Sequence, residues 1–338
     1  LHDHFQETVF VSGNSNQERE IKMGKTHKKD KIVVVGAGNV GEAIAYTLMV
    51  RDQANDIVLV DVNEARAKGA ALDIAHGTSF YKQIWVRQGG YEECADARLI
   101  IITAGVARKP GQTRLDLAKI NVNIAKDITK SIMKYADNPL ILVVSNPADI
   151  ITKAVTETSG LPANRVIGTG TSLDTARFRY SISARLHVNV EDVNAYVLGE
   201  HGDSQVPIWS SANIAGFPLD DFADQVKHKI DKEAVAERTK NGGAEVIGLK
   251  GATFYGIAMS VSNLVEAIIR DDSAILPVAH VLDEKFGEWA GVAFSIPCRL
   301  GWEGIEKTLM IPMNDEEKAA MDRSAQILKD FWEQVKNQ

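Results

Sequence analysis

The chain has 338 residues, of which 45% are hydrophobic and 25% charged, and its formal net charge is −7. This composition is typical of a soluble globular protein with room for two lobes, and the negative charge argues against a nucleic-acid partner. Only Cys94 and Cys298 occur, which excludes a disulfide framework or a thiolate zinc site and fits the reducing cytoplasm. No apolar run approaches the roughly twenty residues that span a membrane.

The first residues differ in texture from the rest of the chain. Residues 1–22 are polar and aperiodic, and they lack the apolar core of a signal peptide. We expect them to be a disordered extension, or a segment foreign to the protein that precedes a natural start at Met23. We expect a dinucleotide-binding domain over 23–165 and a substrate domain over 166–338.

A glycine loop follows the first predicted strand. Residues 32–35 are an unbroken apolar run, as in a strand buried on both faces of a parallel sheet. Gly36, Gly38 and Gly41 then follow in G-x-G-x-x-G spacing, and apolar residues recur at helical intervals from Val40. In the dinucleotide fingerprint the first glycine permits a tight turn, the second lets a pyrophosphate approach, and the third lets the helix lie close to the strand. The helix N-terminus offers free N–H groups to the phosphates.

An acid stands where the fingerprint requires one. The apolar run 57–60 ends in Asp61, about twenty residues after Gly41. A carboxylate there accepts hydrogen bonds from the ribose hydroxyls and repels the 2′-phosphate of NADP. The predicted cofactor is therefore NAD, and the competing interpretation is an ordinary strand, turn and helix followed by a chance acid.

Strands and helices alternate through the first half, which predicts βαβ units and a parallel sheet. The expected helices are 63–76 and 113–135, and the expected strands after 57–60 are 84–87, 97–103 and 140–144. Beyond Arg165 the expected helices are 171–185, 229–247, 252–269 and 315–334, with an alternating stretch at 188–198 and hairpin strands at 274–282 and 291–297. The fold class is α/β: an N-terminal Rossmann doubly wound parallel sheet, followed by a C-terminal mixed α+β substrate lobe.

Three residues in the second half have the chemistry of an acid–base site. His201 lies between Glu200 and Gly202 at a predicted strand end, where it is either a turn histidine bonded to its neighbours or a proton donor. Asp174 and Arg177 are three apart on a helix and share a face. They form either an ordinary intrahelical ion pair, or a set in which Asp174 pairs with a histidine imidazolium and Arg177 binds a substrate carboxylate.

Two further residues follow strands of the first half. Arg114 opens a helix after the exposed loop 106–112, where it is either a solvated surface cation or a group that swings over a bound substrate. Asn146 ends a central strand, where it is either a turn former before Pro147 or part of the nucleotide site. Ligands of such folds bind at the carboxyl ends of the parallel strands.

These motifs, in this order, resemble the L-lactate/L-malate dehydrogenase family: the glycine loop with Asp61, loop 104–117, Ser145-Asn146-Pro147, LDTARF at 173–178 and GEHGD at 199–203. The resemblance covers the chain from Lys31 to the C-terminal helix. It implies that His201 donates and accepts the proton with Asp174 as its partner, and that Arg177 binds the substrate carboxylate. It implies that Arg114 polarises the carbonyl and that Asn146 and Thr253 line the site. We expect no metal ligands. The cofactor-binding positions it implies are Gly36, Gly38, Val40, Gly41, Asp61, Thr103, Ala104, Gly105 and Asn146.

Different parts of the chain resemble the lactate and the malate enzymes of this family. Arg108 stands at the loop position that contacts the third carbon of the substrate, where malate enzymes carry arginine and lactate enzymes glutamine. The stretches 168–174, 199–201, 206–209 and 250–253 instead resemble lactate enzymes, the bacterial ones above all. We expect reversible reduction of pyruvate to L-lactate with real activity on oxaloacetate through Arg108; the alternative is an L-malate dehydrogenase.

The resemblance also implies a homo-oligomer, a dimer or a tetramer. Many bacterial lactate enzymes are activated by fructose 1,6-bisphosphate at a basic subunit interface; Arg179 matches one cation of that site, whereas Asn194 replaces its histidine. Two other classes stay open, a non-catalytic dinucleotide-binding protein and an NAD-dependent glycoside hydrolase. The second requires a metal, for which the sequence offers no convincing ligand pair.

Overall fold

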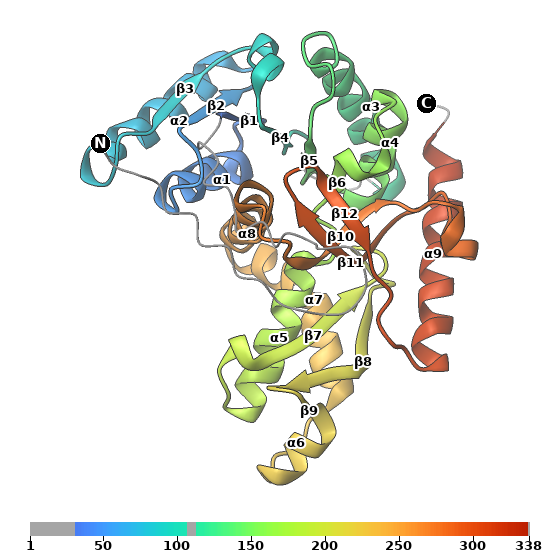
Figure 1. Ribbon diagram of the computed structural model, residues 1–338. Helices are drawn as coiled ribbons and strands as arrows, with labels where there is room; N and C mark the ends of the chain where they lie inside the picture. The colour runs from blue at the N-terminus through green and yellow to red at the C-terminus, as the bar shows by residue number, and fades with distance from the viewer. Residues whose placement is uncertain (1–30, 107–112, 337–338) are drawn as a thin grey trace, which may run out of the picture.

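The structure is a computed structural model that describes residues 31–106 and 113–336, except the side chain of Arg114. A nine-stranded sheet forms its centre, and a separate three-stranded sheet lies beyond one end of it (Figure 1). Within the described residues, no helix combines the length and the apolar character needed to cross a bilayer.

The first half alternates strands and helices, as its sequence predicts. Its strands are β1 (Lys31–Val35), β2 (Asp56–Val60), β3 (Trp85–Gln88), β4 (Leu99–Ile102), β5 (Ile141–Val143) and β6 (Val166–Gly168). Its helices are α1 (Asn39–Val50), α2 (Glu64–Gly77), α3 (Arg114–Ile132) and α4 (Ala148–Ser159). Short 3₁₀ turns lie at η1 (Thr78–Phe80), η2 (Tyr91–Asp96) and η3 (Ala163–Arg165).

These six strands are parallel, in the order β6-β5-β4-β1-β2-β3. The central strands β1 and β4 are paired from Ile32 with Leu99 to Val35 with Ile102, and almost every side chain in them is buried. Continuous apolar strands are expected where helices cover both faces of a sheet. The strand order reverses direction at β1, so the loops after β1 and β4 flank a crevice of the kind that holds nucleotides. The predicted Rossmann sheet is confirmed.

The second half contributes five helices and six strands. The helices are α5 (Ser172–Leu186), α6 (Leu219–Gln225), α7 (Lys232–Lys250), α8 (Tyr255–Arg270) and α9 (Asp315–Val335), with 3₁₀ turns at η4 (Val190–Asp192) and η5 (Glu284–Trp289). The strands are β7 (Val193–Leu198), β8 (Val206–Ile214), β9 (Phe217–Pro218), β10 (Ile275–Val281), β11 (Ala293–Gly301) and β12 (Gly304–Thr308). The predicted hairpin is confirmed as the antiparallel pair β10–β11, and the predicted mixed lobe is present.

The hairpin and β12 do not form a sheet of their own. β10 pairs antiparallel with β6 through Ala279 and Gly168, and the order continues through β11 to β12. The central sheet therefore runs from the first half into the second without a break at Arg165. The division of the chain into 23–165 and 166–338 stays a prediction.

The small sheet β7-β8-β9 packs on α5 and forms a second core. Phe178 and Ile182 of α5 lie fully buried against Val197 of β7 and Ile214 of β8. At the end of β7 the chain bends back toward the central sheet, where Gly199 exchanges main-chain hydrogen bonds with Ser295 of β11. This contact fixes the start of the turn that carries His201.

Candidate active site

The three glycines of the loop after β1 have different surroundings. Gly36 has φ +110°, and a Cβ there would lie 2.6 Å from the Thr103 side-chain oxygen. A Cβ on Gly41 would overlap the carbonyl oxygen of Gly36, because α1 starts against the loop. A Cβ on Gly38 would meet nothing within 4 Å. The loop is therefore packed tightly at its two ends and open in the middle, as close approach of a pyrophosphate requires.

Asp61 lies beside this loop at the end of β2. Its carboxylate accepts a hydrogen bond from the backbone N–H of Ala37 at 2.7 Å and another from that of Asn63 at 2.8 Å. The acid is thus oriented by the loop that precedes the cofactor helix. Val40 lies in the first turn of α1, where it packs partly buried against the core. The glycine loop and Asp61 together fit a dinucleotide.

The residues after β4 and β5 are tied to the glycine loop and to each other. The Thr103 hydroxyl donates to the carbonyl of Gly36 at 3.0 Å, and the amide of Ala104 donates to Val35 at 3.1 Å. Gly105 and the exposed Asn146 are joined by Asn121 of α3, whose side chain lies against Gly105 and donates to the Asn146 carbonyl at 2.8 Å. Sequence reasoning did not single out Asn121, which reads as an ordinary residue of an amphipathic helix.

Asp174 of α5 brings two cationic side chains together. One carboxylate oxygen lies 2.5 Å from Nδ1 of His201, and the other accepts from the Arg177 guanidinium at 3.0 Å. The Asp174 side chain is only 4% exposed, whereas those of Arg177 and His201 are 21% and 27% exposed. The two cations are partly open to solvent. Arg177 can therefore bind an anion, and His201 can give a proton to a neighbouring acceptor at the same place.

The protonation of the pair follows from its surroundings. Burial lowers the pKa of His201, but the charge of Asp174 and its hydrogen bond outweigh burial and raise that pKa to about 9. Burial acts to raise the pKa of Asp174, yet His201 and Arg177 hold it below its usual value. Since Asp174 is a carboxylate, Nδ1 carries a hydrogen toward it, and Nε2 is left to give a proton to a ligand.

Helix α7 shapes the space beside Arg177. A Cβ on Gly242 would lie 3.2 Å from Cδ of Arg177, and one on Gly243 would lie 3.5 Å from its guanidinium. The glycine pair therefore lets α7 pass close to the arginine. Thr253 is half-buried in the connection from α7 to α8, and within the described residues no hydrogen bond joins it to His201 or Arg177.

The side chains of two residues predicted to contact the substrate are not described by the structure. Arg114 is the first residue of α3, directly after the Thr113 cap, but the position of its guanidinium is not described. Arg108 lies outside the described residues. Their contacts with a substrate stay predictions.

Asp149 is a residue that sequence reasoning missed. It lies in the first turn of α4 and is 3% exposed. Its Oδ2 accepts a hydrogen bond from the backbone N–H of His201 at 2.7 Å. The only signal for it is its place three residues after Asn146, and an acid in the first turn of a helix has an ordinary explanation in the helix dipole.

The described part of the chain has no group of three His, Cys, Asp or Glu side chains arranged to hold a metal ion. The site as described consists of the His201, Asp174 and Arg177 side chains beside the glycine loop.

Comparison with known proteins agrees with this geometry. Residues 30–168 match the lactate/malate dehydrogenase NAD-binding domain, and residues 171–338 match the lactate/malate dehydrogenase alpha/beta C-terminal domain. An L-lactate dehydrogenase of Acetivibrio thermocellus is 44% identical over 304 residues, which are 89% of this chain and 96% of that protein.

Solved structures show the same likeness. The minor L-lactate dehydrogenase of Enterococcus mundtii aligns with TM-score 0.88 and 40% identity over 93% of this chain and 100% of that chain. A malate dehydrogenase of Picrophilus torridus aligns with TM-score 0.85 and 33% identity over 92% of this chain and 98% of that chain. The cofactor is NAD, in accord with the matched NAD-binding domain and with Asp61 beside the glycine loop. The chain belongs to the lactate/malate dehydrogenase family.

Proposed function

We propose that this protein is an NAD-dependent L-lactate dehydrogenase, which reduces pyruvate to L-lactate and catalyses the reverse reaction. One observation carries the proposal: the carboxylate of Asp174 bonds both His201 and Arg177, at 2.5 and 3.0 Å. Reduction of a 2-keto acid requires a proton donor and a carboxylate-binding cation a few ångströms apart, and this carboxylate holds such a pair. The cofactor supplies the hydride.

In this proposal each side chain has one task. Arg177 pairs with the substrate carboxylate and so orients the keto carbon toward the nicotinamide. His201 gives its Nε2 proton to the keto oxygen as negative charge develops there. Asp174 accepts the Nδ1 hydrogen of His201, which fixes the orientation of the ring, and it stabilises the imidazolium before the proton is transferred. Arg114, at the start of α3, stabilises the negative charge on the same oxygen.

A malate dehydrogenase is the second candidate, and the identity of Arg108 favours it. A guanidinium at that loop position forms a paired contact with the second carboxylate of oxaloacetate. We therefore propose that oxaloacetate is also a substrate. A non-catalytic dinucleotide-binding protein remains the candidate of another class, and the intact arrangement of His201, Asp174 and Arg177 argues against it.

Steady-state oxidation of NADH with pyruvate and oxaloacetate, measured side by side, tests these candidates. We expect turnover with both and a higher kcat/KM for pyruvate. A higher kcat/KM for oxaloacetate would identify a malate dehydrogenase, and the absence of NADH oxidation with either acid would favour the non-catalytic candidate.

We further propose a cytoplasmic homo-oligomer, a dimer or a tetramer. Large apolar side chains are exposed on α5 and α8, where Tyr180 is 62%, Tyr255 69% and Met259 52% exposed, and exposed apolar side chains of this size are candidates for subunit contacts. We do not propose activation by fructose 1,6-bisphosphate, because Asn194 stands where that site has a histidine.

A further inference from the structure

The main chain of His201 is anchored by a buried acid. Oδ2 of Asp149 accepts the His201 N–H at 2.7 Å, while Oδ1 has no hydrogen-bond partner among the residues that the structure describes. Burial without pairing disfavours the charged form of a carboxylate. Burial accordingly raises the pKa of Asp149 to about 7, although the neighbouring His201 acts to lower it.

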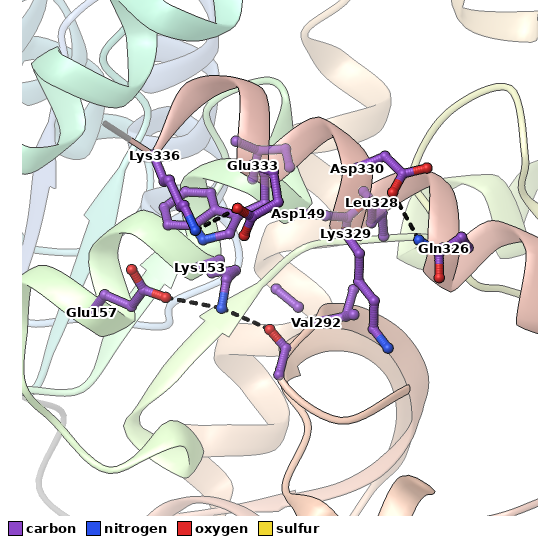
Figure 2. A pocket seen from close by; sticks show the side chains of 14 residues that line it. Asp149, Lys153, Glu157, Val292, Gln326, Leu328, Lys329, Asp330, Glu333 and Lys336 are labelled. Atoms are coloured by element: carbon purple, nitrogen blue, oxygen red, sulfur yellow. Dashed lines mark hydrogen bonds and ion pairs between the residues drawn. The ribbon is translucent and has the colours of Figure 1, made fainter. Parts of the chain in front are cut away.

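A cavity of about 630 Å³ between α4 and α9 lies against the same acid (Figure 2). Asp149 lines it, whereas His201 does not, so Asp149 forms part of the wall between the cavity and the His201 turn. Its Oδ1 is nevertheless screened from solvent. Water in the cavity therefore does not hydrate this oxygen directly.

Lys153 lies one turn after Asp149 on α4 and is the lysine of this helix. Its ammonium group donates to the carbonyl of Gly291 at 2.7 Å and pairs with Glu157 at 2.9 Å (Figure 2). It also lies 5.2 Å from the centre of the Trp332 ring. Within the described residues no lysine or arginine forms an ion pair with Asp149, so its charge acts chiefly on His201.

Charged and titratable groups surround Asp149 from three sides. They are His201 and Glu200 of the turn after β7, Asp174 of α5, Lys153 and Glu157 of α4, and, around the cavity, Lys329, Asp330, Glu333 and Lys336 of α9. The α9 charges are largely paired among themselves or with main chain: Lys336 with Glu333, Asp330 with Gln326, and Lys329 with the carbonyl of Glu288.

We propose that Asp149 is a positioning residue for His201: one carboxylate oxygen fixes the His201 main chain, and the ionised form of the acid adds to Asp174 in keeping the imidazole protonated until the keto acid binds. The charges of Asp149 and Asp174 both favour the imidazolium. Asp174 contacts the ring, whereas Asp149 acts through the main chain and through space. The inference rests on the proposed function, since it assigns a role only if His201 donates the proton.

Two substitutions separate the charge from the anchor. Asp149→Asn keeps an oxygen that accepts the His201 N–H and removes only the charge, whereas Asp149→Ala removes both. The matched control is Glu157→Gln, which removes an acid from the same helix and cavity wall without touching His201. Circular dichroism and NADH titration establish that each variant folds and binds cofactor.

The measurement is kcat and KM for pyruvate from about pH 6 to about pH 10. For Asp149→Asn we expect the pH at which KM rises to fall by about one unit, a common size for the loss of one neighbouring charge, with kcat at the acidic end within about threefold of wild type. For Asp149→Ala we expect the same shift and a kcat lower by about tenfold, because the turn loses its anchor. Glu157→Gln should match wild type.

The inference is overturned if the profile of Asp149→Asn superimposes on those of wild type and Glu157→Gln, or if Asp149→Ala retains the wild-type kcat. Failure of the proposed function gives a different result, because wild-type protein would then oxidise no NADH with pyruvate or oxaloacetate.

Discussion

Asp61 and Ala37 join the ends of the neighbouring strands β2 and β1: the carboxylate after β2 accepts the N–H of Ala37 in the glycine loop at 2.7 Å. The bond orients the acid. In the dinucleotide fingerprint an acid at this position faces the ribose, where its charge would repel a 2′-phosphate by several kcal/mol. We predict that Asp61→Ser raises the NADPH-to-NADH ratio of kcat/KM at least about tenfold. Glu64→Gln, which removes an exposed acid from the start of α2, serves as control. An unchanged ratio in Asp61→Ser would contradict the ribose assignment.

Alanine at two glycines of the loop should affect different properties, cofactor binding in one case and stability in the other. Gly38 has φ −82° and open space around it, so Gly38→Ala should leave stability unchanged and weaken NADH binding by about tenfold. Gly41→Ala places a Cβ on the Gly36 carbonyl and should lower the free energy of unfolding by about 1–3 kcal/mol. Urea denaturation and NADH fluorescence titration measure both. Equal losses of stability would contradict the assignment of Gly38 to the cofactor.

Removal of the His201 imidazole should abolish chemistry and spare binding. His201→Gln should lower kcat by about two or more orders of magnitude, the usual scale for general acid–base catalysis, while the Kd for NADH stays unchanged. A variant that keeps most of its activity would disprove the mechanism.

The direction of the pH dependence follows from the raised pKa of His201. That pKa is about 9, above its ordinary 6.5, so the free enzyme carries the proton until the pH passes about 9. KM for pyruvate should stay flat below that pH and rise above it, whereas KM for lactate, which requires neutral His201, should fall over the same range. Opposite trends would indicate another proton donor.

Arg108 should set the preference between the two keto acids. In the arrangement that we propose, its charge lacks a partner over the methyl group of pyruvate, whereas oxaloacetate supplies a carboxylate. We predict that Arg108→Gln raises the pyruvate-to-oxaloacetate ratio of kcat/KM by at least about tenfold. Lys109→Gln, at the neighbouring loop position, should leave the ratio unchanged. If Arg108→Gln behaves like Lys109→Gln, Arg108 faces away from the substrate.

His280 of β10 should make the fold sensitive to acid. It is 6% exposed, and burial lowers its pKa from 6.5 to about 4. A group with a lowered folded-state pKa contributes stability above pH 6.5, which is lost as the pH falls through about 4. We predict that wild type loses about 2 kcal/mol more than His280→Gln between about pH 7 and pH 4.5, measured by urea denaturation. Parallel losses would show that His280 is not responsible.

The sequence predicts the local parts of this molecule better than their assembly. The run at β1, the glycines and Asp61 are tied to one another by short-range geometry, so the nucleotide half could be predicted with its element order. The three residues of β6 are too few to give a periodic signal, and their pairing with β10 joins positions more than a hundred residues apart. Such pairings depend on tertiary packing, which periodicity does not report.

The candidate site divides in the same way. Asp174 and Arg177 share a helix face that can be read from their spacing, and the structure pairs them. The contact of His201 with Asp174 spans 27 positions; the residues alone leave it as one of two alternatives, and the family resemblance selects it. Asp149 carries only the weak local mark of an acid in the first turn of a helix, because its partner is a backbone N–H and its burial cannot be read from the local sequence.

The unbroken sheet limits how this protein can move and how it can be divided. Because β6 bonds to β5 on one side and to β10 on the other, a hinge between the two halves would have to break main-chain hydrogen bonds inside a buried sheet. Closure over a substrate is therefore left to the loops and helices around the sheet's edge. For the same reason, two fragments cut near Arg165 would each expose an unpaired strand edge, where other chains can pair and aggregate.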